Sequence, residues 1–70
     1  MNKTFILAFN YHEAKSFINK NPGDYIILNR PEQLLGTDRP IVKIMINAYR
    51  RDDYLDIMEA IYIRGGTILR

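Results

Sequence analysis

Cysteine is absent from this 70-residue chain, histidine occurs once, and no apolar run approaches the roughly 18 residues of a membrane-spanning helix. Without cysteine there are no disulfides and no thiolate zinc site, so core packing or self-association must stabilise the chain. One histidine among scattered acids does not bring together the ligands of a metal site. The first residues also lack the regions of a signal peptide. We therefore expect a soluble cytoplasmic protein that binds no metal and no membrane.

Glycine-rich phosphate-binding loops are missing as well. Neither G-x-G-x-x-G nor G-x-x-x-x-G-K-[ST] occurs, and the pair Gly65-Gly66 is predicted to form a turn. A chain of 70 residues also leaves little room for a substrate pocket. These absences disfavour a nucleotide-dependent enzyme of the usual kinds, and we expect a non-enzymatic protein without a cofactor.

The composition is that of a globular domain. Apolar residues make up 47% of the chain and charged residues 26%, far from the range of disordered chains. This length suits one domain, so residues 1–70 are expected to fold as a single unit. The net charge of +2 and the pI near 9.1 permit contact with nucleic acid or phosphate without arguing for it.

Four segments are predicted to be strands of a parallel sheet. Residues 3–9 carry an apolar run without polar alternation, which is typical of a central strand covered on both faces. Residues 25–28 and 41–46 have the same character. Lys43 interrupts the latter, but its stem can lie on apolar surface with its ammonium in water. Residues 66–70 form a last short strand.

Two long helices and one short helix are expected between these strands. Asn10 and Glu13 have the spacing of a capping box, in which each side chain accepts from a backbone amide of the first helical turn. Pro31 and Gly36 stand where a short helix would begin and end. The acidic pair 52–53 begins the second long helix. The apolar stripes expected to pack on the sheet are Ala14, Phe17 and Ile18, and then Tyr54, Leu55, Met58, Ile61 and Tyr62.

Each long helix joins two parallel strands by a right-handed crossover. We therefore predict an α/β fold, a minimal doubly wound (Rossmann-like) four-stranded parallel sheet of order 2-1-3-4, with the two long helices on opposite faces. One helix alone shields a face incompletely. A homodimer that buries this face is a hypothesis, which a monomeric mass in light scattering at high protein concentration would reject.

Ligands of open parallel sheets bind at the carboxyl ends of the strands, near the point where the strand order reverses. The residues at this edge predicted to bind a partner or an anion are Asn10, Tyr11, His12, Arg30, Tyr49, Arg50 and Arg51, with Arg70 ending the last strand nearby. Arginines and helix N-termini suit a phosphate, whereas the tyrosines could stack on bases or anchor a protein partner. A merely solvated edge is the alternative, because Asp52 and Asp53 partly neutralise Arg50 and Arg51.

His12 is the one residue that suggests acid–base catalysis. The sequence places no carboxylate to orient it, and a pair with Ser16 lacks the third member of a catalytic triad. A position on the helix surface is therefore the favoured interpretation. A small enzyme using His12 is kept as an alternative, which loss of turnover with retained folding in His12→Ala would support.

Three segments resemble small phage-encoded α/β proteins. They are N-Y-x-E-A from Asn10 to Ala14, R-P-E-x-L-x-G from Arg30 to Gly36, and Y-R-R-x-D-Y-x-x-I-M-E-A from Tyr49 to Ala60. The resemblance implies a phage or prophage source, and hence the host cytoplasm, and no particular activity. It favours binding to a host or replication component over catalysis.

These observations predict a non-enzymatic binding protein that contacts a host or replication protein through the carboxyl edge of its sheet. The first alternative is a nucleotide or nucleic-acid phosphate at the same arginine-rich edge, and the second is the small enzyme. Ionic strength separates a protein partner from a phosphate, because phosphate contacts weaken steeply with salt.

Overall fold

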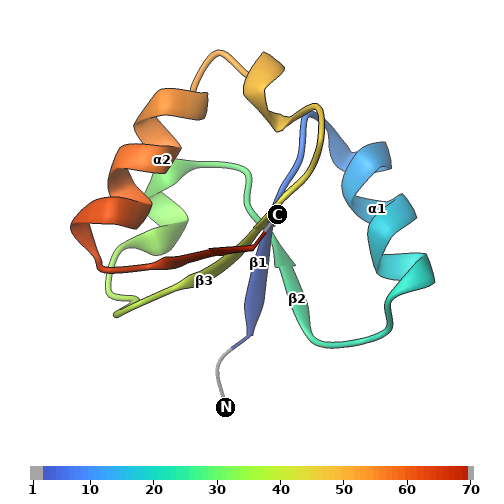
Figure 1. Cartoon of the computed structure of the whole chain (residues 1–70), viewed down its shortest axis with the longest axis horizontal. Coiled ribbons are helices and arrows are strands. Elements are labelled where there is room, and N and C mark those ends of the chain that lie inside the picture. The colour runs from blue at the N-terminus through green and yellow to red at the C-terminus, as the bar shows by residue number, and fades with distance from the viewer. Residues whose placement is uncertain (1–2, 70) are drawn as a thin grey trace.

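The structure is a computed structural model that describes residues 3–69, so Arg70 lies outside the described residues. Four strands occur in this range: β1 (Thr4–Leu7), β2 (Tyr25–Ile27), β3 (Ile41–Ile44) and β4 (Thr67–Leu69). They alternate with two α-helices, α1 (Tyr11–Lys20) and α2 (Tyr54–Ile63), and with two 3-10 turns, η1 (Pro31–Leu34) and η2 (Ala48–Arg50) (Figure 1). The predicted short helix at residue 31 is thus a single 3-10 turn.

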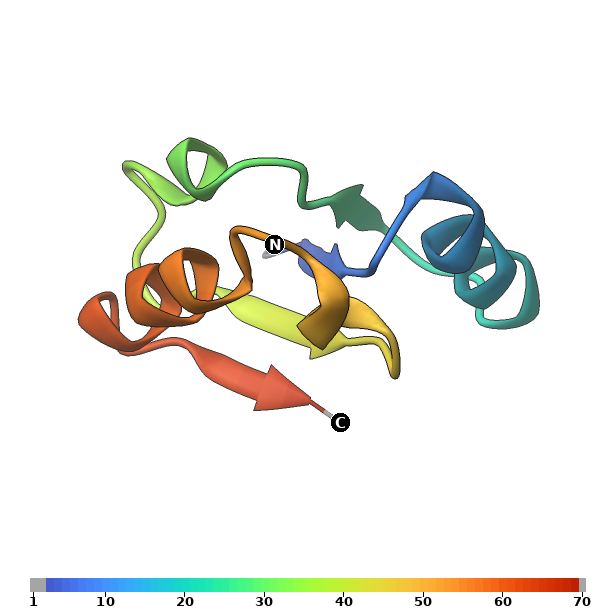
Figure 2. The same ribbon diagram turned by 90° about the horizontal axis from the view of Figure 1, so that it is seen from above.

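The sheet is parallel throughout, with the order β2-β1-β3-β4, which confirms the predicted α/β topology. The two α-helices lie on opposite sides of the sheet (Figure 2). The strands are shorter than the predicted runs at 3–9, 25–28 and 41–46, because the chain turns towards the next helix. Ladder bonds continue one residue further, where the amides of Leu28 and Met45 donate to Ile6 and Leu7 at 2.9 Å.

Alternate residues of each strand enter two separate cores, as the pleat of a sheet requires. The larger core lies under α2 and η1 and contains Phe5, Leu7, Leu28, Leu34, Val42, Ala48, Ile57, Met58 and Ile61. The smaller core lies under α1, where buried Ile6, Ala8 and Ala14 pack with the partly buried side chains of Phe17 and Ile18. The apolar stripe predicted for α1 is therefore confirmed.

The predicted core stripe of α2 is wrong at two of its five positions. Leu55 and Tyr62 are exposed, whereas Ile57, which was not assigned to the stripe, is fully buried beside Met58 and Ile61. The helix is apolar around most of its circumference, so its sequence does not indicate which side faces the sheet. The packing partners decide this, because Ile57, Met58 and Ile61 enter the larger core together with residues of the sheet and of η1. Gly65, with a φ of 65°, ends the helix as predicted.

Candidate functional site

The carboxyl ends of β1, β2 and β3 meet at one edge of the sheet, which we call the carboxyl edge. The seven predicted site residues follow these strand ends, in the first turn of α1, in the loop after β2, and in and after η2. Six of them are exposed: Asn10, Tyr11, His12, Arg30, Tyr49 and Arg50. The seventh, Arg51, has a side chain only 16% exposed. Its surroundings differ in kind from those of the others.

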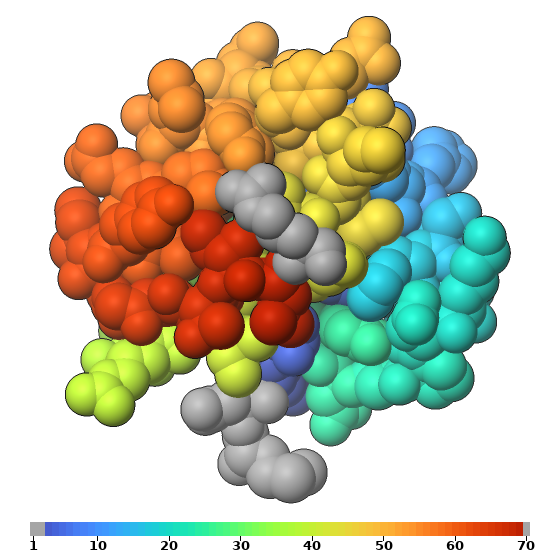
Figure 3. Space-filling model, in the orientation of Figure 1, coloured from blue at the N-terminus to red at the C-terminus, as the bar shows by residue number. Residues whose placement is uncertain are grey.

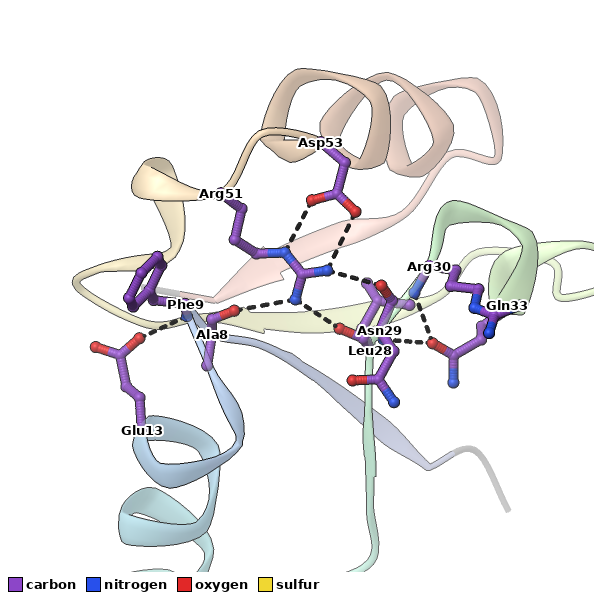
Figure 4. A network of polar contacts seen from close by, with 9 residues as sticks. All are labelled: Ala8, Phe9, Glu13, Leu28, Asn29, Arg30, Gln33, Arg51 and Asp53. Carbon is purple, nitrogen blue, oxygen red and sulfur yellow. Dashed lines mark hydrogen bonds and ion pairs between the residues drawn. The ribbon is translucent and has the colours of Figure 1, made fainter.

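The guanidinium of Arg51 joins the carboxyl ends of β1 and β2 (Figure 4). Nη1 donates to the carbonyl oxygens of Ala8 and Leu28 at 3.1 and 3.2 Å, and Nη2 donates to that of Asn29 at 2.7 Å. Nε and Nη2 also donate to the Asp53 carboxylate, at 2.8 and 3.1 Å. All five N–H groups of the guanidinium are thereby engaged within the chain. Arg51 therefore holds the edge together, and it has no donor left for an external anion.

Asp53 occupies the N-cap position of α2, but its side chain does not cap the helix. The carboxylate instead receives the two hydrogen bonds from Arg51, a bidentate geometry that favours its charged form. These hydrogen bonds and the adjacent positive charge hold the pKa of Asp53 below its ordinary value of 3.8. Protonation of Asp53 at low pH should therefore weaken its hydrogen bonds with Arg51 at this edge.

We expect Asp53 to contribute to the loss of stability in acid. Its pKa is lower in the folded chain than in the unfolded chain, so its contribution is present above pH 3.8 and is lost as the pH falls through the folded pKa. Urea unfolding between about pH 5 and about pH 2 should show a shallower decline in Asp53→Asn than in the wild type. Asp52→Asn, the same change at the exposed neighbouring residue, is the control. Equal pH slopes in all three proteins would contradict this assignment.

Glu13 bridges the loops that follow β1 and β3, at the point where the strand order reverses. Its Oε1 accepts from the Phe9 amide at 2.8 Å, while Oε2 accepts from the amide and the side-chain Nδ2 of Asn47 at 3.1 and 2.9 Å. Asn10 Oδ1 accepts from the Glu13 amide at 2.9 Å, as predicted. The other half of the capping box differs from the prediction. The Glu13 carboxylate accepts from the backbone amide of Phe9, and not from that of Asn10. The carboxylate also binds Asn47, a partner 34 positions away in the sequence.

A second internal acceptor occupies the end of β2. The side-chain oxygen of Gln33, in η1, accepts from the backbone amides of Asn29 and Arg30. At both strand ends, then, amides that could bind an external anion at a switch point already donate to a side chain of the protein. Glu13 also places a negative charge there. Sequence reasoning saw Glu13 only as a helix cap and did not assign Gln33; their positions in the first turn after a strand were the available signal.

Large apolar side chains remain exposed at the same edge. Phe9, Tyr11 and Tyr49 are exposed, and Ile46 is 82% exposed. The guanidinium carbon of Arg50 lies 5.4 Å from the centre of the Phe9 ring, a cation–π contact. Phe9 and Ile46 were missed as site residues because they end apolar runs that read as buried strands. The edge surface is hereafter Phe9, Tyr11, Ile46, Tyr49 and Arg50.

His12 is exposed on the first turn of α1, as the surface interpretation predicts. Its ring meets the Tyr11 ring edge-on, with 6.2 Å between the centres. Glu13, the next residue, cannot orient the imidazole while its carboxylate binds Phe9 and Asn47. The geometry around His12 therefore offers no support for a catalytic pair.

Comparison of the chain with protein-family models, with curated proteins and with solved structures finds no match. Within residues 3–69, no three histidine, cysteine, aspartate or glutamate side chains converge as metal ligands. In the same range neither α1 nor α2 is long and apolar enough to cross a membrane.

Proposed function

We propose that this protein is a non-enzymatic binding module that contacts a protein partner through the edge surface. The observation that carries the proposal is the contrast at the carboxyl edge. Backbone carbonyl and amide groups at its strand ends are paired internally by Arg51, Glu13 and Gln33, while its large apolar and aromatic side chains are exposed. Exposed aromatic residues and arginine on a rigid support are the usual anchors of protein interfaces.

Phosphate binding at this edge is the less favoured function. A phosphate at the switch point would have to displace the Glu13 carboxylate from the amides of Phe9 and Asn47, and would meet its negative charge. Four arginines are predicted there, of which Arg70 lies outside the described residues; among the other three, Arg51 has no free donor, which leaves Arg30 and Arg50. Within residues 3–69, two exposed arginines supply little of the charge that phosphate-dependent binding requires.

The proposed partner is a protein of the host cell or of the replication machinery. The resemblance to small phage-encoded proteins supports a host or replication protein, met in the cytoplasm of the host. An edge whose strand ends are tied by internal hydrogen bonds suits such a role, because little ordering of the backbone is needed on binding.

A photo-cross-linking amino acid at position 49 is expected to capture the partner in extracts of the host cell. Tyr62, on the outer side of α2, is the matched control, because it is 67% exposed and Tyr49 is 66% exposed. A discrete adduct should form at position 49 at about tenfold the yield at position 62. It should persist as the salt concentration is raised.

Three results would count against the proposal. Equal yields at positions 49 and 62 would mean that the edge surface is not a preferred interface. Loss of the adduct in moderate salt would favour the phosphate alternative. No adduct at position 49 would remove the protein partner altogether.

A further inference from the structure

One face of the sheet packs against α1, and in the described residues no helix covers the half of this face formed by β3 and β4 (Figure 2). In Figure 2, α1 lies beside β1 and β2, and no described helix lies on that side of β3 and β4. The register pairs Lys43 with Ile6 on one side and with Leu69 on the other, so the three side chains share this face. Ile6 is buried by α1, whereas Leu69 is 42% exposed. Parallel sheets are normally covered on both faces, so this half lacks its second layer.

A groove continues from this open half to the carboxyl edge. It has a volume of about 520 Å³ and lies between α1 and the segment from η2 to α2. Its lining includes Phe17, Lys43, Met45, Ile46, Tyr49 and Tyr54. Figure 3 shows the yellow segment that follows β3 at the surface between the atoms of α1 and those of α2. Ile46 and Tyr49 belong both to the groove and to the edge surface.

One charge lies in this apolar groove. The Lys43 ammonium lies 5.6 Å from the centre of the Phe17 ring, and within residues 3–69 it forms no ion pair. An occupant that covers Lys43 with apolar atoms alone would remove the ammonium from water without compensation. A carboxylate on the occupant would pair with it. The groove is therefore complementary to an apolar surface that carries an acidic side chain.

This charge disfavours a second copy of the chain as the occupant. A closed dimer places the same patch of both subunits together, so two copies joined through this face would bring one Lys43 ammonium towards the other. Neither copy supplies an acid from the groove lining, which contains no aspartate or glutamate. A second copy of the chain, as in the homodimer expected from the incompletely shielded face, is thus less well supported as the occupant than a different protein.

We propose that the groove binds an amphipathic helix of the partner protein, with its apolar stripe on Met45, Ile46 and Tyr49 and a glutamate or aspartate paired with Lys43. This helix would lie beside α1 and supply the layer that β3 and β4 lack. The inference depends on the proposed function, because it names what the partner inserts next to the edge surface. Beyond the edge surface, it specifies the groove as the binding site, a helix as the shape of the bound segment, and an acidic side chain that pairs with Lys43.

Stapled helical peptides are the probe for this proposal. A displayed library of peptides of about 16 residues, with a fixed leucine stripe and randomised flanks, is selected on the full chain. The enriched peptides are expected to carry Asp or Glu at one position beside the stripe. Lys43→Met, which keeps the apolar stem, should weaken their binding about tenfold. Changing the acid of the peptide to Gln should weaken binding to the wild type equally, but not binding to Lys43→Met.

Two control variants locate the effect. Lys15→Met removes a lysine from the exposed side of α1, and Tyr11→Ala alters the edge surface outside the groove lining. Both variants should leave binding of the selected peptides unchanged. Absence of selected peptides, peptides without an acid, or equal binding to Lys43→Met would overturn the inference. A dimer in light scattering that Lys43→Met strengthens would also overturn it. If these failures occur while position 49 still captures a protein, the proposed function stands and only the helix is lost.

Discussion

Replacement of Arg51 with methionine is expected to lower the free energy of unfolding by about 3–5 kcal/mol. The change removes all five donors, so the carbonyl oxygens of Ala8, Leu28 and Asn29 and the carboxylate of Asp53 lose their partner. Acceptors left unpaired in a partly buried place cost more than the hydrogen bonds themselves contributed. A domain of this size has a total stability of only about 4–10 kcal/mol. The variant should therefore be largely unfolded under conditions in which the wild type is stable.

Urea unfolding followed by circular dichroism measures the loss. Arg51→Lys keeps a positive charge but not the planar fork, and we expect it to lose about 1–3 kcal/mol. Arg50→Met is the matched control, because Arg50 is the exposed neighbour whose contact is with the Phe9 ring. It should change stability by less than about 1 kcal/mol. Similar losses in Arg50→Met and Arg51→Met would show that Arg51 does not hold the strand ends together.

Glu13→Ala is expected to cost about 3 kcal/mol, the second largest effect. The carboxylate accepts from the amides of Phe9 and Asn47 and from the side chain of Asn47, so one residue joins the loops after β1 and β3. Glu13→Gln should lose nearly as much. Its amide offers one acceptor oxygen in place of two and turns an N–H group towards another donor.

A double-mutant cycle isolates this bridge. If Glu13 acts through Asn47, the losses in Glu13→Ala and Asn47→Ala will sum to more than the loss in the double variant. Glu59→Ala, at an exposed position of α2, controls for removal of a glutamate from a helix. Strict additivity would mean that Glu13 stabilises only the helix start, as the capping box alone implies.

The edge surface and the groove show why sequence patterns reached the fold more readily than the site. Apolar runs and turn residues are local signals, and they were enough for the four strands, their order and the helix between each pair. The hydrogen bonds of Arg51 connect residues that lie 22 and 43 positions away, and those of Glu13 reach across 34 positions. No local spacing predicts such contacts. The sequence pattern of an arginine near a strand end is the same whether the side chain binds a phosphate or a backbone carbonyl.

The orientation of α2 is a second case. Its sequence is apolar on several sides, and the stripe inferred from spacing included Leu55 and Tyr62, which the structure exposes. Ile57 is buried in their place because η1 and β3 cover that side of the helix. A helix with a wide apolar surface takes its orientation from what it packs against.

The amino-acid sequence by itself determined the class and order of this fold, because consecutive apolar residues demand burial on both faces and right-handed crossovers leave few ways to arrange four parallel strands. It also indicated that the seven predicted site residues would lie near the carboxyl edge, since parallel strands end on the same side, but it did not indicate Phe9, Ile46 or Gln33. Only the tertiary structure decided the role of each one. Arg51 and Glu13 turn inward because unpaired carbonyl and amide groups at the strand ends require partners. Tyr49 and Ile46 stay outside because no element of residues 3–69 is placed to cover them.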